Sequence, residues 1–199
     1  MKKIIIISVV LLHSCLLFGQ VSDYLFISSD TISKVSEELS RLFEINNKSR
    51  DDSVAFFKCF PSTFSLFKAI YDYGSPLYEE SYSHIEFFFS NISVDESQMI
   101  DKLIGLSIGG RWDADAINYL SKGTRDFVNS HISATVSVLQ NKSEIESYSF
   151  WLFIFDGPHP SNLREDFNVI YTKVFAQNVV QANLLRKAYV YLIESEKHH

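Results

Sequence analysis

Residues 143–160 read SEIESYSFWLFIFDGPHP, and this stretch decides the fold. Ser143 followed by Glu146 is a capping box, in which a hydroxyl and a carboxylate three residues apart hydrogen-bond backbone N–H groups at the start of a helix. The run FWLFIF then ends at Asp-Gly-Pro, and glycine followed by proline is a typical stop signal. These signals predict a helix over residues 144–155. Because its second half is apolar on every side, we expect it at the centre of a helical bundle.

The same stretch also has the composition of a β-strand, because aromatic and β-branched residues favour strands. Upstream, Ile132, Ala134, Val136 and Val138 alternate with other residues as a strand would require. A β-hairpin around Asn141 is therefore the alternative structure. We favour the helix, since its start box, its terminal glycine and the following proline all agree.

Helix start and stop signals continue outward in both directions along the chain. Capping residues and acidic first turns recur, followed by apolar residues spaced three and four apart. The range 49–74 contains Pro61, which must kink or restart the helix because it cannot donate its backbone hydrogen bond. These signals predict an all-α fold, a single-domain bundle of seven or eight helices over residues 21–199. The expected helices cover residues 31–45, 49–74, 75–89, 93–108, 113–122, 124–135, 144–155 and 163–192.

Two of these helices have boundaries that rest on single local signals. Ser93 with Glu96 forms a second capping box and predicts a helix that begins at residue 93. Asp113 is the expected N-cap of the following helix, and Gly123 is its expected end.

The first twenty residues, MKKIIIISVVLLHSCLLFGQ, have the layout of a secretory signal peptide. Lys2 and Lys3 form a basic segment, residues 4–12 are apolar throughout, and residues 18–20 lead into a polar chain. The apolar run is shorter than the ~20 residues that a membrane-spanning helix needs. We therefore expect residues 1–20 to be cleaved, and the mature protein to be exported, periplasmic or secreted, with no transmembrane span.

Cys15 raises a second way of processing this segment. It resembles the cysteine of a bacterial lipobox, which would attach the protein to a membrane through a lipid. His13 and the apolar residues 16–18 are unlike a lipobox and its polar tether, so ordinary cleavage is the favoured prediction. Cys59 would then be the remaining cysteine of the mature chain, and no intrachain disulfide would form.

The chain is acidic, and this limits its partners. The formal charge of −6 becomes −8 when Lys2 and Lys3 are removed with the signal peptide. Nucleic-acid-binding proteins concentrate Lys and Arg on one face, so nucleic acid is not an expected partner. An acidic surface favours solubility, and it is also compatible with a basic protein partner.

The 109–115 loop, Gly-Gly-Arg-Trp-Asp-Ala-Asp, is the first candidate binding site. Arg and Trp are the residues that dominate the energetics of protein interfaces, and neighbouring glycines suit a recognition loop. We therefore consider Arg111, Trp112, Asp113 and Asp115 as partner-binding residues. The structural alternative is that the tryptophan packs on the following helix while the first aspartate caps it.

The 156–160 loop, Asp-Gly-Pro-His-Pro, is the second candidate. Its glycine and two prolines stiffen a segment that displays a carboxylate and an imidazole. Asp156 and His159 would act as a binding pair or as an acid/base pair. In the structural alternative, Asp156 hydrogen-bonds the backbone of its own loop.

Other motifs do not predict a metal or a cofactor. Glu80 and His84 lie one helical turn apart, with Glu86 close by, but a metal site needs three or four ligands and no second pair has this spacing. We expect these residues on the surface. Phosphate-binding glycine loops and nucleophile elbows are absent from the sequence.

Two functions from different classes follow from these observations. The first is an exported cell-envelope protein that acts by protein binding, such as an inhibitor or an immunity-type protein that neutralises a toxin. The second is an exported hydrolase that uses Asp156 and His159, with Asp113 or Asp115. We favour the binding protein, because the sequence contains no recognisable catalytic motif.

Overall fold

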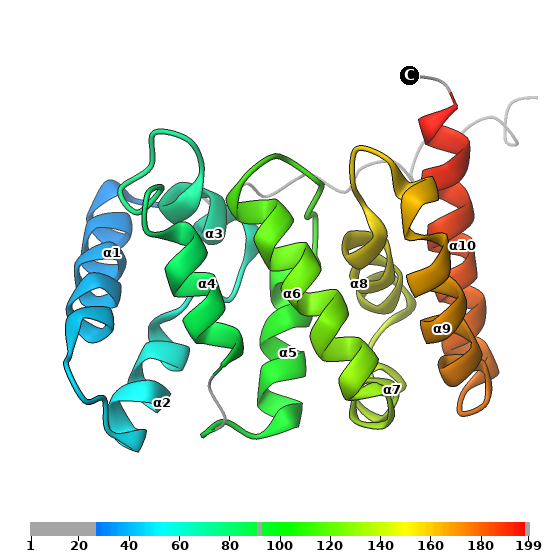
Figure 1. The fold of residues 1–199 in the computed structure, drawn as a ribbon, viewed down its shortest axis with the longest axis horizontal. Coiled ribbons are helices and arrows are strands. Elements are labelled where there is room, and N and C mark those ends of the chain that lie inside the picture. Colours follow the sequence, from blue (N-terminus) through cyan, green and yellow to red (C-terminus); the bar gives the residue numbers. More distant parts are fainter. Residues whose placement is uncertain (1–26, 91–92, 198–199) are drawn as a thin grey trace, which may run out of the picture.

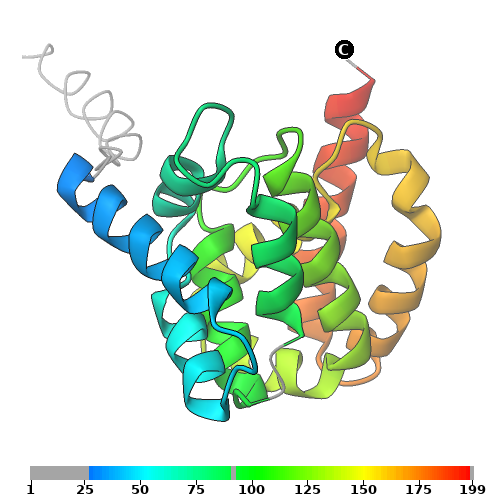
Figure 2. The same cartoon turned by 60° about the vertical axis from the view of Figure 1, so that its left-hand side comes forward.

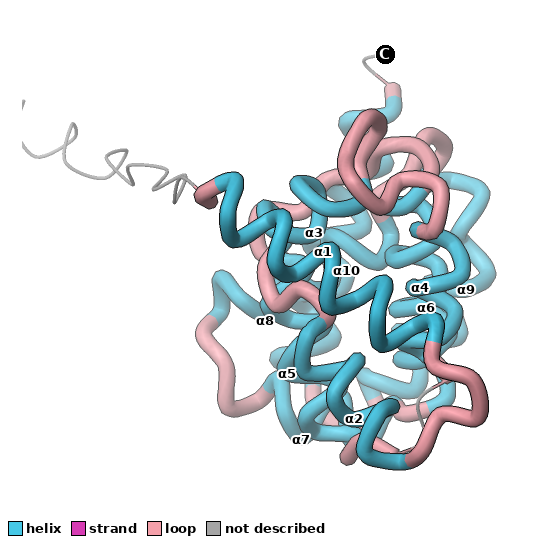
Figure 3. The backbone as a smooth tube through the Cα atoms, turned by 90° about the vertical axis from the view of Figure 1, so that its left-hand side faces the viewer, coloured by secondary structure: helices cyan, strands magenta, loops and turns pink. Residues whose placement is uncertain are grey.

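The computed structural model describes residues 27–90 and 93–197, and this part of the chain contains ten α-helices, one 3₁₀-helix and no strand (Figures 1 and 3). The all-α prediction is confirmed. The predicted signal peptide, residues 1–20, and Cys15 within it lie outside the described residues. Among the described helices, none combines the length and the hydropathy needed to cross a bilayer.

The helices follow one another with short connections. The first half contains α1 (Ser29–Glu44), α2 (Arg50–Cys59), α3 (Phe64–Tyr71), α4 (Ser81–Phe89) and α5 (Glu96–Ser107). The second half contains α6 (Ala116–Ser130), α7 (Ile132–Leu139), α8 (Glu144–Phe155), η1 (Pro160–Leu163), α9 (Arg164–Phe175) and α10 (Val179–Glu196).

α8 is the central helix, with the predicted bounds. Ser143 accepts the Glu146 N–H while the Glu146 carboxylate accepts the Ser143 N–H, so the predicted capping box is present. The residues from Phe150 to Phe155 are all buried, and α8 packs against α5, α6 and α10. A helix that is apolar on every side is stable only when other helices surround it. The alternative β-hairpin is wrong.

A buried hydrogen-bond network joins α8 to α10 and to the end of α7. The Trp151 indole Nε1 donates to Gln181 Oε1 at 2.9 Å. Gln181 Nε2 donates in turn to the Leu139 carbonyl at 3.1 Å and to Ser147 Oγ at 3.2 Å. The polar groups of this part of the core are therefore paired, as burial requires.

The helices are arranged in order along the longest axis of the molecule, from α1 at one end to α9 and α10 at the other (Figure 1). From α3 onward, each helix contacts the helix two positions further along the chain: α3 with α5, α5 with α7, α7 with α9, and likewise α4, α6, α8 and α10. Figure 2 shows the same succession from another side. Packing of this kind is typical of stacked helical pairs, in which terminal helices keep one face uncovered.

The helix count exceeds the predicted seven or eight, because the ranges 49–74 and 163–192 each contain two α-helices. At Pro61 the helix restarts, one of the two outcomes predicted for this proline, so α2 and α3 are separate helices. A separate break at residues 176–178 divides α9 from α10, and Asn178 caps the second of these helices.

Gly123 was predicted to end a helix, and this prediction is wrong. It lies inside α6, where the ring of Phe89 occupies the space of its missing side chain. The glycine allows α4 to pack closely on α6, and this tertiary contact overrides the local stop signal.

The Ser93–Glu96 capping box is also wrong. Asp95 is the N-cap of α5, and its carboxylate accepts the Ser97 N–H at 2.8 Å. Two residues with good capping side chains lie within one turn here, and the sequence pattern does not choose between them.

Gly105 is a site where packing on backbone predicts a large mutational effect. A Cβ at this position would lie 2.4 Å from the Ser62 carbonyl oxygen. Alanine normally stabilises a helix interior by about 1 kcal/mol relative to glycine. We expect Gly105→Ala to destabilise the protein instead, by about 1–3 kcal/mol in urea unfolding, because the opposing backbone cannot move aside. Gly123→Ala is the comparison and should cost less stability, because the opposing atoms there belong to the partly exposed Phe89 ring, which can move. An equal or larger loss of stability in Gly123→Ala would contradict this reasoning.

Candidate functional site

The 109–115 loop and the 156–160 loop lie against each other at the end of α8. The Trp112 backbone N–H donates to Asp156 Oδ2 at 2.9 Å, and Arg111 Nη1 lies 3.9 Å from the same oxygen. The Asp156 side chain is only 14% exposed, whereas that of Arg111 is 54% exposed. Charge-assisted hydrogen bonds to a largely buried carboxylate have a well-defined geometry. These contacts therefore hold the two loops in one arrangement.

Two glycines bring the 109–115 loop onto the central helix. A Cβ at Gly110 would lie 2.8 Å from the ring of Phe153, so only glycine fits between the loop and α8. Gly109 has a φ of +72°, in the left-handed region that glycine adopts without strain. The two residues that follow are thereby fixed above the end of α8.

The last helix contributes the third side of the site. His159 Nδ1 lies 3.6 Å from Glu196 Oε1. The Ser161 N–H and Oγ also donate to the Glu196 carboxylate, at 3.1 and 3.0 Å. On the same helix, the Tyr191 ring lies 5.6 Å from the Arg111 guanidinium carbon, a cation–π distance.

These groups line one pocket of about 510 Å³ between the two loops and α10. Its volume falls within the range of ligand-binding pockets in proteins. The indole Nε1 of Trp112 is buried and has no hydrogen-bond partner in the described part of the chain. The side chains that give the pocket its chemistry are Arg111, Trp112, Asp156, His159, Tyr191 and Glu196.

Four of the six predicted site residues thus meet in this pocket, and two do not. Asp113 Oδ2 lies 3.4 Å from Lys68 Nζ, and Asp115 accepts the Tyr78 hydroxyl at 2.7 Å. Neither aspartate lines the pocket. The hydrogen bond to Asp115 raises the pKa of Tyr78 to about 12, because it stabilises the neutral phenol.

Asp113 also fails to cap the following helix. The N-cap residue of α6 is Asp115, which has a φ of +57° and makes no side-chain cap hydrogen bond. Positive φ is uncommon for a residue with a side chain. The hydrogen bond from Tyr78 helps to hold this strained position.

Asp156 and His159 have different partners. The Asp156 carboxylate accepts a hydrogen bond from the other loop, rather than from its own loop as the structural alternative predicted. His159 lies beside Glu196, and the nearby Ser161 hydroxyl donates to that carboxylate. The two side chains are therefore held by different groups, Asp156 by the 109–115 loop and His159 by α10.

Tyr191 and Glu196 are site residues that the sequence reasoning missed. Leu185, Tyr189 and Leu192 mark the buried face of α10, and Tyr191 falls outside that stripe with 46% exposure. An exposed aromatic residue on the last helix was the available signal. Its neighbour Arg111 is eighty residues away in sequence, so spacing could not pair them.

His84, which we expected on the surface, is buried in an aromatic cluster. It is 1% exposed, its ring lies 4.4 Å from that of Phe43, and its Nδ1 lies 3.1 Å from the Tyr71 hydroxyl oxygen. The described residues contain no group of three or more His, Cys, Asp or Glu side chains that could hold a metal ion. Burial, with a smaller effect from Lys48, lowers the pKa of His84 to about 4.

This burial predicts a pH dependence of stability. The pKa of His84 is about 4 in the folded chain and 6.5 as the reference for an unfolded chain, so the unfolded state binds the proton first. The contribution of neutral His84 to the free energy of unfolding should be fully present above pH 6.5. It should fall by about 2 kcal/mol as the pH approaches 4. Urea unfolding of wild type and His84→Gln from pH 7 to 4.5 should show a smaller loss in the variant. His159→Gln is the control, since that side chain is 69% exposed; parallel curves for wild type and His84→Gln would refute the assignment.

No protein-family model matches the chain, and neither curated proteins nor solved structures give a match.

Proposed function

We propose that the protein is exported and acts by binding another protein, as an inhibitor or an immunity-type protein that neutralises a toxin. The proposed binding site is the pocket formed by the 109–115 loop, the 156–160 loop and α10. One observation carries the proposal. Arg111 and Trp112 meet Tyr191, which is about eighty residues away in sequence, around one pocket of about 510 Å³.

The residue types support protein binding. Trp, Tyr and Arg are enriched among the few residues that supply most of the affinity in protein interfaces. Arg111 and Tyr191 are 54% and 46% exposed, so a partner can contact both. The contact of Trp112 with Asp156 fixes the loops in advance. A preformed site loses little conformational entropy on binding, which leaves more of the contact energy as affinity.

The charge of the protein supports a basic partner. The whole chain has a formal charge of −6, and the pocket includes the carboxylates of Asp156 and Glu196. Complementary charge accelerates association and makes it sensitive to salt. We expect the association rate with the partner to fall as ionic strength rises.

A photo-crosslinking experiment tests this proposal. A photoreactive phenylalanine analogue is placed at Tyr191 or, as the control, at Tyr73, which is 85% exposed and lies outside the pocket. Both variants are expressed in the native cells and irradiated. We expect a discrete protein adduct from position 191 that is absent from position 73.

The other outcomes of this experiment are equally informative. Adducts of the same protein from both positions, or from neither, would contradict a binding site at this pocket. Hydrolysis of a substrate that is lost in Asp156→Asn and His159→Gln would favour the hydrolase, the second function considered from the sequence.

A further inference from the structure

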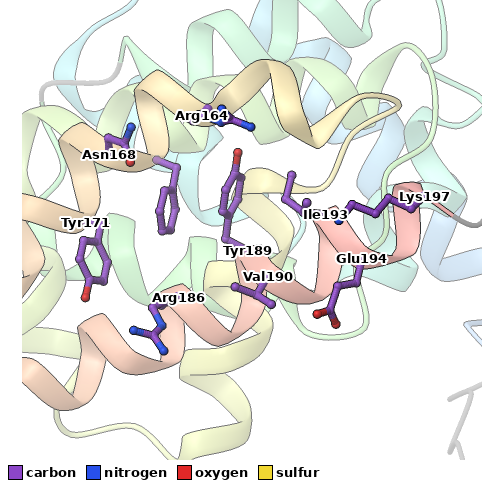
Figure 4. Close-up of a pocket in the computed structure, with 10 residues that line it drawn as sticks. Arg164, Asn168, Tyr171, Arg186, Tyr189, Val190, Ile193, Glu194 and Lys197 are labelled. Carbon is purple, nitrogen blue, oxygen red and sulfur yellow. The ribbon is translucent and has the colours of Figure 1, made fainter.

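A second pocket lies on the other side of α10, in the groove between α9 and α10 at the end of the helical array (Figures 1 and 4). Its volume of about 580 Å³ falls within the range of small-molecule sites. The facing sides of the two helices supply its lining, and the loops of the first pocket do not contribute. It is therefore a separate site.

Aromatic rings form the apolar wall of this groove. The rings of Phe167 and Tyr189 are stacked, with centroids 4.0 Å apart and an angle of 11° between their planes. Tyr171 stacks on Phe167 at 5.5 Å, one helical turn further along α9. The Tyr189 hydroxyl is fixed by donating to the Pro160 carbonyl at 3.2 Å. Tyr189 is buried, whereas Phe167 and Tyr171 are only half-buried, so parts of these two rings remain open to the groove and can contact an apolar ligand.

Three cations surround the aromatic wall. Arg164, Arg186 and Lys197 line the groove together with one carboxylate, that of Glu194 (Figure 4). None of the three cations forms a salt bridge with a described residue. Figure 4 shows Arg164 beside the hydroxyl of Tyr189 and Arg186 on the opposite side of the groove.

The positive charge of this groove contrasts with the acidity of the whole chain, whose formal charge is −6. Several lysines and arginines elsewhere on the described surface are paired with carboxylates, for example Lys122 with Asp126 at 2.6 Å and Lys142 with Asp101 at 2.8 Å. Guanidinium and ammonium groups that lack a carboxylate partner and lie next to an apolar wall are complementary to a ligand that has an anionic group on an apolar body.

We infer that the groove between α9 and α10 binds a small amphiphilic organic anion, an aromatic or similarly flat apolar body that carries a carboxylate. The ring of the ligand packs against Phe167 and Tyr171, and its carboxylate accepts hydrogen bonds from Arg186, which lies on the same side of the groove as Tyr171 (Figure 4). This site is independent of the proposed protein-binding pocket, and either one can fail without the other.

Titration of the protein with 2-naphthoate tests the inference, with 2-naphthylmethanol as the neutral counterpart of the same shape. Isothermal titration gives the affinity, and ¹H–¹⁵N shift changes give the location. We expect one naphthoate site with shifts confined to α9 and α10, and an affinity for the alcohol that is lower by about tenfold or more.

Two matched variants separate site-specific binding from general charge attraction. Arg186→Gln removes a groove cation, whereas Lys187→Gln removes the same charge from the next residue, which is paired with Glu144 at 3.7 Å outside the groove. Arg186→Gln should weaken naphthoate binding about tenfold and leave binding of the alcohol unchanged, and Lys187→Gln should change neither. Equal affinity for naphthoate and the alcohol, equal losses in the two variants, or shifts outside the groove would overturn the inference.

Discussion

Trp151→Ala should destabilise the protein by about 3–5 kcal/mol, because removal of a large buried ring leaves a cavity that the packed helices cannot fill. Trp151 is 0% exposed and lies at the centre of α8. The substitution also leaves the Gln181 side-chain oxygen without the indole N–H that it accepts at 2.9 Å. Both effects act in the same direction. Equilibrium unfolding in urea, followed by circular dichroism, measures the loss.

Two variants on the same helix give this prediction its controls. Ile145→Ala removes an apolar side chain that is 64% exposed, and it should change stability by at most about 0.5 kcal/mol. Trp151→Phe keeps most of the buried ring and loses the hydrogen bond, so its effect should lie between the other two. If Trp151→Ala unfolded at the same urea concentration as Ile145→Ala, α8 would not be the central helix.

The elements that were predicted correctly have signals that agree locally. The bounds of α8 follow from a capping box, an apolar run and a glycine-proline stop, all within sixteen residues. The start of α2 was also predicted at Ser49 from the acidic residues of the first turn, and Ser49 caps the helix there. Where several local signals agree, tertiary packing has no competing preference to override.

The incorrect predictions concern positions whose structure is determined by contacts with a distant part of the chain. Gly123 reads as a helix stop, but Phe89 packs on it and the helix continues. The sequence places Asp113 and Asp115 in one recognition loop, but neither lines the pocket. Asp113 binds Lys68, 45 residues earlier, and Asp115 binds Tyr78, 37 residues earlier. Local spacing contains no information on such partners.

The candidate site was predictable in part for the same reasons. The unusual composition of the two loops identified Arg111, Trp112, Asp156 and His159 from the sequence. Their meeting at one pocket depends on Gly110 packing against α8 and on the Trp112–Asp156 hydrogen bond. The contribution of α10 could not be predicted, because it requires the position of the last helix relative to the loops.

Trp112→Ala should weaken binding of the crosslinked partner by about 2 kcal/mol or more, roughly thirtyfold, because tryptophan at the centre of a site supplies a large share of the affinity. Arg111→Ala should also weaken binding, by about 1–2 kcal/mol, since it removes the contacts of Arg111 with Tyr191 and with Asp156 as well as the proposed contact with the partner. Circular dichroism and a urea titration must show that both variants are folded.

The affinity of the purified partner for Trp112→Ala and for Asp113→Asn tests the central claim most directly. The two residues are neighbours in sequence, but Trp112 lines the pocket, whereas Asp113 faces Lys68. Titration calorimetry should give a dissociation constant about thirtyfold higher for Trp112→Ala, and one within about twofold of wild type for Asp113→Asn. Equal dissociation constants for wild type and Trp112→Ala, or a larger loss in Asp113→Asn, would contradict a binding site in this pocket.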